Sequence, residues 1–385
     1  MKRLRAAHVV AAIGDEAMGP SYSVPRLCRS LVDSGVEVRL HVLARGSARV
    51  ASGVEVHQYA EWPGRFFRTL GVSPRMHRAL VDEARHVELI HNHSLWMLPN
   101  VYPGLAVRGT TCALVTSPRG VLARWSRQRS YVRKKAMWWL GQRFTVERTT
   151  CFHATSEAEC ESVREMGFRA PVAIIPNGVD VPSDDVAASV KEASRRRVVF
   201  FGRIHPVKGV DRLIEAWASL QSRFADWEVD IVGPGGDSYA VEMRRLAERL
   251  ACTRVHFHDA VYGDEKWKAL ARAELFVLPS RTENFGMTVA EALAVGVPAI
   301  VTKNAPWEGL DRERCGWWIE DGVDSLRSAM VRALSMPPDE LSAMGKLGRS
   351  WMIRDFSWHS IGQRMAKTYD WIIRGGTTPS WIRVG

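Results

Sequence analysis

The sequence has no long apolar run and no cysteine motif. No uninterrupted apolar stretch among the 385 residues approaches the roughly 18 needed to cross a bilayer. The six cysteines form no C-x-x-C pair and no zinc-like spacing, as expected of scattered core thiols in a reducing cytosol. The basic N-terminal start precedes a short apolar run without a convincing cleavage site, so we expect a first β-strand and not a signal peptide. These absences favour a cytoplasmic protein.

Several ligand-binding signatures are also missing. The chain contains neither the G-x-G-x-x-G fingerprint of dinucleotide-binding domains nor a G-K-[ST] phosphate loop. It has no D-x-D motif that would hold a divalent cation, so we predict no metal and no resident cofactor. No internal repeat or low-complexity tract is evident, which argues against a solenoid.

The charge is strongly one-sided. A net charge of +11 and a pI near 9.6 predict an anionic partner, without distinguishing nucleic acid, an anionic membrane and phosphorylated small molecules. Residues 119–148 carry many basic residues, the single acid Glu147, and Trp125, Trp138 and Trp139. One interpretation is a helix on an anionic membrane surface, and the other is a solvated basic face with tryptophans packed inward. We expect a membrane-surface partner and no nucleic acid.

Short β-type runs alternate with amphipathic segments through most of the chain, which predicts βαβ units and parallel sheets. A polar stretch near residues 177–197 separates two such series. We expect two doubly wound, Rossmann-like α/β domains facing a cleft, at residues 1–178 and 196–354, with a linker at 179–195. A C-terminal helix within 355–385 is expected to pack back on the first domain, and the last eleven residues are expected to form a surface extension.

Two Gly-rich turns follow strands in the second half. In "FFGRIHPVKG", Gly202 permits a tight turn, and Arg203 and Lys208 stand before a helix, where free N–H groups favour anions. In "IVGPGGDSY", Gly233 permits close backbone approach to a ligand. Each motif alone also fits a solvated loop or a plain tight turn.

The stretch "SRTENFGMTVAEALAVGVPAI" carries Glu283 and Glu291 in an otherwise almost uncharged segment. We expect Glu283 in a loop beyond a strand and Glu291 on the second turn of the next helix. Asn284, Phe285 and Gly286 present backbone N–H groups at that helix start. Carboxylates accept paired hydroxyl hydrogen bonds well, so both are candidates to contact a sugar or ribose.

These segments together resemble the retaining GT-B glycosyltransferases of family 4. The resemblance rests on "GRIHPVKG", "ATSEAE", "IIPNGVD", "DAVYGDEKWKALARAELFVLPS" and "PSRTENFGMTVAEALAVGVPAIV", and it covers most of the chain. "IHNHSLWMLPN", "SPRGVLARW" and "KNAPWEGLDRERCGWWI" look like the branch that builds bacterial cell-envelope polysaccharide or lipopolysaccharide.

The resemblance implies a hexosyltransferase that uses a UDP- or GDP-linked sugar and retains anomeric configuration. Arg203 and Lys208 would hold the diphosphate and stabilise it as it leaves. Glu283 would contact donor-sugar hydroxyls and Glu291 the ribose, while the backbone near Val261 would touch the base. A turn near Gly19 would close over the phosphate and face a saccharide acceptor, which we expect to be lipid-linked, at the inner face of the cytoplasmic membrane.

The chain departs from the family in its first half. Many members have a double glycine followed by an acid in the first turn, where this sequence reads "MGPSYS". Many also have a histidine where this chain has "TSPRG", so Arg119 is a candidate for that place and His93 a second acceptor-side candidate. His93 is equally typical of a structural hydrogen-bonding residue.

Other functions remain open from the residues alone. A sugar-nucleotide epimerase or a phosphorylase would use the same scaffold, although no pyridoxal-binding lysine context is visible. A non-enzymatic basic protein on a membrane or nucleic acid would explain residues 119–148. It would give no reason for Glu283 and Glu291 beside two Gly-rich turns.

Overall fold

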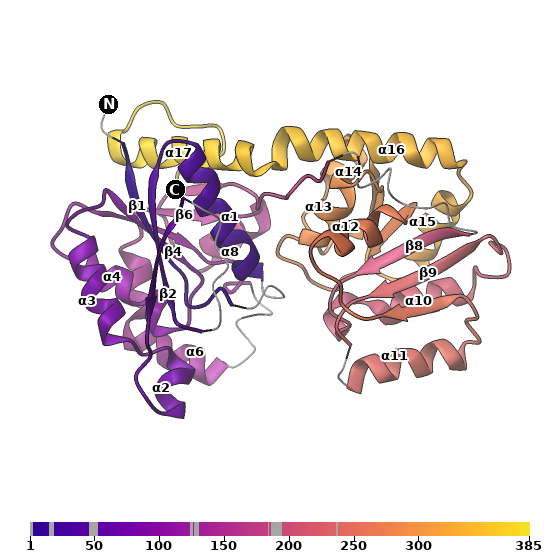
Figure 1. Ribbon diagram of the computed structural model, residues 1–385, viewed down its shortest axis with the longest axis horizontal. Helices are drawn as coiled ribbons and strands as arrows, with labels where there is room; N and C mark the ends of the chain where they lie inside the picture. Colours follow the sequence, from indigo (N-terminus) through magenta and orange to yellow (C-terminus); the bar gives the residue numbers. More distant parts are fainter. Residues whose placement is uncertain are drawn as a thin grey trace. The chain divides into compact units, whose positions relative to one another are not determined.

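The computed structural model describes residues 3–14, 19–45, 53–123, 126, 131–183, 185, 195–235 and 238–385. The chain divides into two compact units, shown in Figure 1. Unit 1 comprises residues 1–178 together with 358–385, and unit 2 comprises residues 179–357. Most of the stretch expected to be a linker, residues 184 and 186–194, lies outside the described residues.

Unit 1 is built on an eight-stranded sheet in the order β14-β7-β6-β5-β4-β1-β2-β3. Neighbouring strands are parallel except β14, which runs antiparallel to β7. The strands are β1 (Arg5–Val9), β2 (Glu37–Leu43), β3 (Glu55–Tyr59), β4 (Leu89–His93), β5 (Ala113–Ser117), β6 (Cys151–Ala154), β7 (Val172–Ile174) and β14 (Ile382–Arg383).

Helices cover both faces of this sheet, because alternate residues of each strand point to opposite sides. In β1, Ala6 packs in a cluster with α1 and α17, whereas Ala7 packs in a second cluster with α3 and α4. The described helices of unit 1 are α1 (Gly19–Asp33), α2 (Arg65–Leu70), α3 (Pro74–Glu83), η1 (Leu98–Asn100), α4 (Tyr102–Ala106), α6 (Tyr131–Met137), η2 (Trp138–Gln142), α7 (Arg143–Glu147), α8 (Glu157–Glu165) and α17 (Trp358–Arg374).

Unit 2 contains a six-stranded sheet in the order β10-β9-β8-β11-β12-β13, with every neighbouring pair parallel. Its strands are β8 (Arg196–Phe201), β9 (Trp227–Val232), β10 (Val255–His258), β11 (Leu275–Leu278), β12 (Ala299–Thr302) and β13 (Gly316–Ile319). Its described helices are η3 (Pro206–Lys208), α10 (Val210–Ala218), α11 (Ser238–Arg249), α12 (Asp264–Ala271), α13 (Met287–Ala294), α14 (Gly309–Arg312), α15 (Val323–Leu334), α16 (Pro338–Trp351) and η4 (Met352–Phe356). The expectation of two doubly wound α/β domains is confirmed.

The expected surface extension at the C-terminus is wrong. Ile382 is buried and pairs with Ala173 of β7, and Trp381 donates from its indole nitrogen to Thr368 Oγ1 at 2.9 Å. This short strand covers the edge of the sheet at β7, which would otherwise leave backbone groups unpaired. The sequence "PSWIRV" is too short to give a recognisable strand pattern.

Among the described helices, none is both long and apolar enough to cross a membrane.

Helix α17 packs closely on α1 through a glycine. A Cβ added to Gly362 would lie 1.8 Å from Ser30 Oγ and 2.6 Å from the Ser30 carbonyl oxygen. Ser30 in turn donates a hydrogen bond to the Trp358 carbonyl. The contact therefore requires a residue without a side chain at position 362.

We expect Gly362→Ala to lower the free energy of unfolding by about 1–3 kcal/mol, because the added methyl forces the two helices apart. Urea unfolding followed by circular dichroism measures this loss. Lys367→Ala, at an exposed position of the same helix, is the matched control and should change stability by less than about 0.5 kcal/mol. Equal stability of the two variants would contradict the close packing.

Candidate functional site

Several candidate donor-binding residues of unit 2 lie at the point where the strand order of the sheet reverses. Strand β8 lies between β9 and β11, so the chain leaves β8 toward one edge and later crosses to the other side. The loops that follow the carboxyl ends of β8 and β11 therefore meet at this point. In doubly wound sheets, ligands bind in the crevice at such a switch point.

The two Gly-rich turns contact each other directly. Gly202 N donates to the Val232 carbonyl at 2.9 Å, and Ile204 N donates to the Pro234 carbonyl at 3.2 Å. A Cβ added to Gly233 would lie 1.9 Å from the Gly202 carbonyl oxygen. Gly233 is thus required for the packing of the two turns. Gly233 is buried and Gly202 is half-buried.

Lys208 and Glu283 form an ion pair across the switch point. Lys208 Nζ donates to Glu283 Oε2, and the two side chains are only 19% and 16% exposed. Lys208 ends the single turn η3, and Gly209 follows with a left-handed φ of 71°. A Cβ at Gly209 would lie 2.1 Å from the Pro279 carbonyl oxygen, so this glycine lets the two loops approach.

Arg281 braces the same two loops. Its backbone N donates to the Val207 carbonyl at 2.8 Å, and its guanidinium pairs with Asp211 on α10, with Nη1 and Oδ1 2.9 Å apart. Burial is the largest single influence on the pKa of Asp211 and raises it, but the charge and hydrogen bond of Arg281, with hydrogen bonds from Tyr239 and the Arg212 backbone, together lower the pKa below its usual value. Arg281 thus fixes the loop that carries Glu283.

Trp307 supports the loop that follows Glu283. The Trp307 indole N–H donates to the Phe285 carbonyl, and the two rings lie 5.2 Å apart between centroids. Gly286 precedes α13 with a φ of 82°, and a Cβ there would lie 3.2 Å from Trp307 Nε1. Asn284 lies in the same loop. Sequence reasoning did not single out Trp307, whose position in "NAPWEG" carries no spacing signal.

Glu291 is buried on α13 and pairs with Lys266 of α12. Lys266 Nζ donates to Glu291 Oε1 at 2.8 Å, and the Glu291 side chain is 7% exposed. Both glutamates of the apolar segment therefore have a lysine partner, which offsets the cost of burying a carboxylate. Sequence reasoning missed Lys266, because α12 and α13 are brought together only by the tertiary fold.

Two other predicted residues lie in loops of unit 2. Arg203 is exposed directly after Gly202, in the loop that also contains Lys208. Val261 lies between β10 and α12, partly buried against the core of unit 2, five residues before Lys266. The structure thus brings Lys208 and Glu283 into contact and keeps Arg203 in the same loop.

The acceptor-side candidates lie in unit 1. Gly19 begins α1, and residues 15–18 before it lie outside the described residues. Arg119 bonds to Ser23 Oγ of α1 at 3.0 Å, to Asn177 Oδ1 at 2.7 Å and to His93 Nδ1 at 3.1 Å. Burial lowers the pKa of Arg119 to about 10. The guanidinium of Arg119 thus joins the first turns of α1 to the end of β4.

The basic stretch of residues 119–148 fits both of its interpretations in part. Trp138 packs inward, 6.3 Å from the Trp96 ring, whereas Trp139 and Leu140 are 68% and 65% exposed. Arg133 and Lys135 are also exposed. Trp125 lies outside the described residues.

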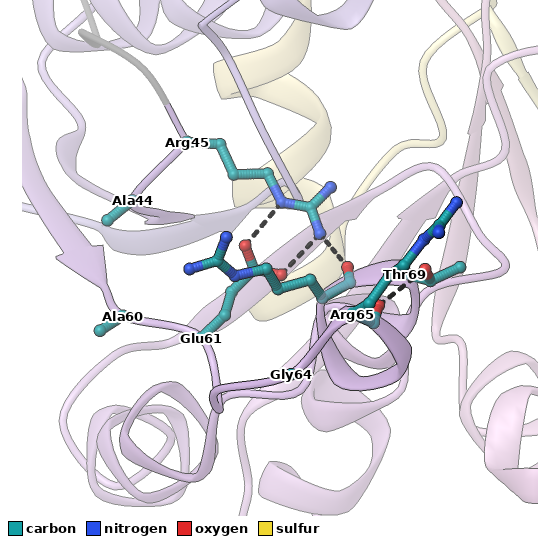
Figure 2. Close-up of a pocket in the computed structure, with 8 residues that line it drawn as sticks. Ala44, Arg45, Ala60, Glu61, Gly64, Arg65 and Thr69 are labelled. Atoms are coloured by element: carbon teal, nitrogen blue, oxygen red, sulfur yellow. Dashed lines mark hydrogen bonds and ion pairs between the residues drawn. The ribbon is translucent and has the colours of Figure 1, made fainter.

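A pocket of about 840 Å³ opens beside α2, after the carboxyl ends of β2 and β3. Figure 2 shows Arg45 joined to Glu61 in this pocket, with Nε–Oε2 and Nη2–Oε1 distances of 2.9 and 2.6 Å. Arg65 and Arg68 also line it, so its charged lining is three arginines and one glutamate. Next to it on the chain, the apolar side chains Trp62, Phe66 and Phe67 are exposed.

Both units match known glycosyltransferase family models. Residues 19–182 match the family described as Glycosyltransferase Family 4, and residues 195–336 match Glycosyl transferases group 1. The architecture of both units is that of the GT-B fold, and these matches show that each unit is similar to a glycosyltransferase family, family 4 in the case of the first.

Relatives and a solved structure extend this similarity. A "GDP-mannose-dependent alpha-(1-6)-phosphatidylinositol monomannoside mannosyltransferase" of Mycolicibacterium smegmatis is 32% identical over 52% of this chain and 56% of its own length. A "D-inositol 3-phosphate glycosyltransferase" of Salinispora tropica is 26% identical over 92% of this chain and 81% of its own. The crystal structure of Anabaena HepE in complex with UDP and glucose superposes with a TM-score of 0.74 at 18% identity, covering 95% of this chain and 99% of that one. The chain spans about half the length of several curated relatives that it matches.

The Lys266–Glu291 pair gives a stability test. We expect Lys266→Ala to lower the free energy of unfolding by about 3 kcal/mol, because it removes the ammonium from a buried carboxylate. The control Lys268→Ala, on the same helix, breaks only the exposed pair with Glu265 and should cost less than about 1 kcal/mol. Thermal and urea unfolding measure both. The double variant Lys266→Ala/Glu291→Gln should recover part of the loss, and no recovery would show that the pair is not its source.

Proposed function

We propose that this protein transfers a hexosyl group from a nucleoside-diphosphate sugar to a saccharide acceptor, with retention of anomeric configuration. The observation that carries the proposal is the Lys208–Glu283 pair at the switch point of the unit 2 sheet. It sets an ammonium suited to phosphate directly beside a carboxylate suited to sugar hydroxyls. A diphosphate sugar needs these two groups in adjacent positions.

In this proposal the protein neutralises the leaving nucleoside diphosphate. Lys208 and Arg203 take the phosphate charge, and the half-buried Gly202 in the same loop has no side chain to obstruct the ligand. Each well-placed donor to developing charge is worth about 2.7–4 kcal/mol. That neutralisation needs no metal remains a prediction. When the diphosphate takes Lys208, Glu283 is released to accept hydroxyl hydrogen bonds from the sugar.

The remaining contacts with the nucleotide-sugar are assigned to other residues of unit 2. The backbone of Asn284, Phe285 and Gly286 lies beside the sugar, Glu291 binds the ribose hydroxyls, and the loop at Val261 contacts the base. The GDP-mannose named for one relative, and the UDP and glucose bound to a protein of similar structure, support a UDP- or GDP-linked hexose. Epimerase, phosphorylase and non-enzymatic readings have no support among these proteins.

The acceptor is proposed to be lipid-linked and contacted by unit 1 near Gly19, His93 and Arg119. The expected lipopolysaccharide branch is not confirmed, because the curated relatives are named for phosphatidylinositol mannoside or inositol 3-phosphate. Both relatives' names specify an inositol-containing acceptor that carries phosphate. This supports a phosphate-bearing acceptor more than one particular polymer.

The donor roles are tested by substitution. We expect Lys208→Ala and Glu283→Ala each to lower transfer by about 100- to 1,000-fold. GDP and UDP, together with their hexose conjugates, provide a thermal-shift panel. Lys208→Ala should lose the shift given by the preferred diphosphate, and Glu283→Ala should keep it while losing sugar transfer.

The control for these variants is Lys268→Ala, whose exposed pair with Glu265 lies outside the proposed site. It should retain both the thermal shift and transfer. Circular dichroism checks that each variant is folded. Full transfer by a folded Lys208→Ala or Glu283→Ala protein would refute the role assigned to that residue.

We also propose that unit 1 docks on an anionic membrane surface at the inner face of the cytoplasmic membrane. Exposed apolar side chains stand on α2 and on α6–η2 beside exposed cations. Leu70 at the end of α2 and Trp138 of η2 pack against one hydrophobic cluster, so the two segments share a support. Aromatic side chains with adjacent arginines are typical of an interfacial surface, and the Arg65–Arg68 pocket suits a lipid phosphate.

Vesicle binding tests this surface. Arg65→Gln/Arg68→Gln should weaken binding to vesicles containing anionic phosphatidylglycerol by about 10- to 30-fold, since each basic residue near such a surface contributes about 1 kcal/mol. Phe66→Ser/Trp139→Ser should also weaken vesicle binding, most clearly at high salt, where the contribution of the arginines is screened. The control Leu347→Ser/Ile353→Ser removes exposed apolar side chains from unit 2 and should bind normally. Unchanged binding by both the arginine variant and the aromatic variant would refute docking at this surface.

A further inference from the structure

A buried series of polar side chains lies on one face of the unit 1 sheet, beneath α17. On successive strands the core residues Ala6, Leu89, Val115, Cys151 and Ala173 face α1 and α17. Two residues further along each strand, and so on the same face, stand His8, His91, Ser117, His153 and Ile175. His93 follows on β4, and Tyr369 comes from α17. All are at most 2% exposed. Such groups are costly to bury unless each polar atom has a partner.

Arg119 fixes the first links of the series. An arginine only donates, so His93 Nδ1 accepts from it at 3.1 Å. A neutral imidazole carries one N–H, which in His93 is then on Nε2, and this nitrogen donates to His8 Nδ1 at 2.9 Å. By the same rule, His8 Nε2 donates to the Tyr369 hydroxyl oxygen at 3.2 Å.

The series continues in one direction to a backbone carbonyl. The Tyr369 hydroxyl donates to His91 Nδ1 at 2.5 Å, and His91 Nε2 donates to Ser117 Oγ at 2.6 Å. Ser117 Oγ then donates to His153 Nδ1 at 2.7 Å, and His153 Nε2 donates to the Ile175 carbonyl at 2.9 Å. A carbonyl only accepts. One end can only donate and the other can only accept, so a single proton arrangement satisfies all seven bonds.

Burial keeps the histidines of this chain neutral. It lowers the pKa of His8 and of His153 to about 3, and that of His91 and His93 well below the usual 6.5. The direction of the hydrogen bonds then places the single hydrogen of each neutral imidazole on Nε2. A neutral chain of fixed direction follows from the geometry and agrees with these pKa values.

A metal site is the competing interpretation of part of this cluster. One nitrogen from each of His8, His91 and His93 lies within 4.8 Å of the others. However, all six of their ring nitrogens already have protein partners. His8 Nδ1 and His93 Nε2 are 2.9 Å apart, closer than the about 3.3 Å that separates two nitrogens on one tetrahedral zinc. The hydrogen-bond chain explains the arrangement better.

We propose that Tyr369 is a positioning residue that completes this one-way chain and thereby holds His93 and the Arg119 guanidinium in place. The Tyr369 oxygen is the junction, because it accepts from His8 and donates to His91. Without it, His8 is left with a buried N–H that lacks an acceptor. Arg119 still needs His93 Nδ1 as its acceptor, so the hydrogens of His8 and His93 stay on Nε2. His8 and His93 must then move to find an acceptor for the His8 N–H, which disturbs the contact of His93 with Arg119.

The consequence for the reaction rests on the proposed function. Arg119 has a left-handed φ of 60°, a conformation that a side chain other than glycine rarely adopts. Its guanidinium also holds Ser23 of α1 and Asn177, so the chain anchors it between the first turns of α1 and β4. Helix α17 thereby fixes the acceptor-side residues His93 and Arg119 without contacting substrate.

Tyr369→Phe tests the inference. Nitrogen-15 NMR of histidine-labelled protein should show hydrogen on Nε2 for His8, His91, His93 and His153 in the unaltered protein. In the variant, the Nε2 resonance of His8 and the Nδ1 resonance of His91 should shift, because each nitrogen loses its hydrogen bond to the Tyr369 hydroxyl. We expect kcat for transfer to fall at least tenfold while KM for the nucleotide-sugar stays within twofold, because the donor contacts are in unit 2.

The control Thr368→Val removes a buried hydroxyl from the neighbouring residue of α17, one that bonds to Trp381 and not to the chain. It should leave the histidine spectrum and kcat unchanged. If Tyr369→Phe does not fold, Ser117→Ala interrupts the chain at a second place. The nitrogen-15 resonances of His91 should then shift, because His91 Nε2 loses its acceptor. Unaltered histidine spectra in both chain variants, or one zinc bound per unaltered protein on these histidines, would overturn the inference.

The spectra do not depend on activity. If the protein transfers no sugar from any nucleotide-sugar tested but Tyr369→Phe still shifts the ring-nitrogen resonances of His8 and His91, the proposed function fails and the chain stands. If transfer is found and kcat is unchanged while these resonances shift, the positioning role fails alone.

Discussion

The parallel pairing of β8 with β11 is the constraint on which the candidate donor site depends. It brings together two loops that are more than 70 residues apart in the chain, and it places Lys208 against Glu283. The approach is close enough that Gly209 tolerates no side chain beside Pro279. Arg281 and Trp307 then hold the Glu283 loop from two sides. The charged groups are thus set before any ligand arrives, which is the condition for electrostatic stabilisation of a leaving group.

Both glutamates of the apolar segment have a lysine, and the two pairs differ in burial. Glu291 is the more deeply buried, and its pair with Lys266 ties α12 to α13. Glu283 is more accessible and pairs with a lysine in a loop, so a ligand can exchange with it at lower cost. In our proposal, the more deeply buried Glu291 has both a structural and a ribose-binding role, and the more accessible Glu283 binds the sugar.

In unit 1, several polar side chains are buried and several large apolar side chains are exposed. Its carboxyl-end face beneath α17 buries four neutral imidazoles, while Phe66, Trp139 and Leu140 are exposed. The buried imidazoles are tolerated because each ring nitrogen is hydrogen-bonded in one consistent direction. Phe66 makes an edge contact with Phe67, and Arg143 lies over the Trp139 ring, but most of the surface of Phe66 and Trp139 is still exposed. They are explained in our proposal by contact with a lipid surface.

The sequence by itself determined the two α/β units and the positions of the Gly-rich turns, because strand and helix periodicities and glycine geometry are local properties. It also located Glu283 in a loop and Glu291 on the next helix. Only the tertiary structure decided that Lys266 neutralises Glu291 and that Trp307 supports Phe285, since these pairs join elements with no fixed spacing. It likewise added β14 to the sheet edge and linked Tyr369 to His93 and Arg119. Hydrogen-bond direction depends on which donors and acceptors meet, and that is settled only when distant strands and α17 pack together.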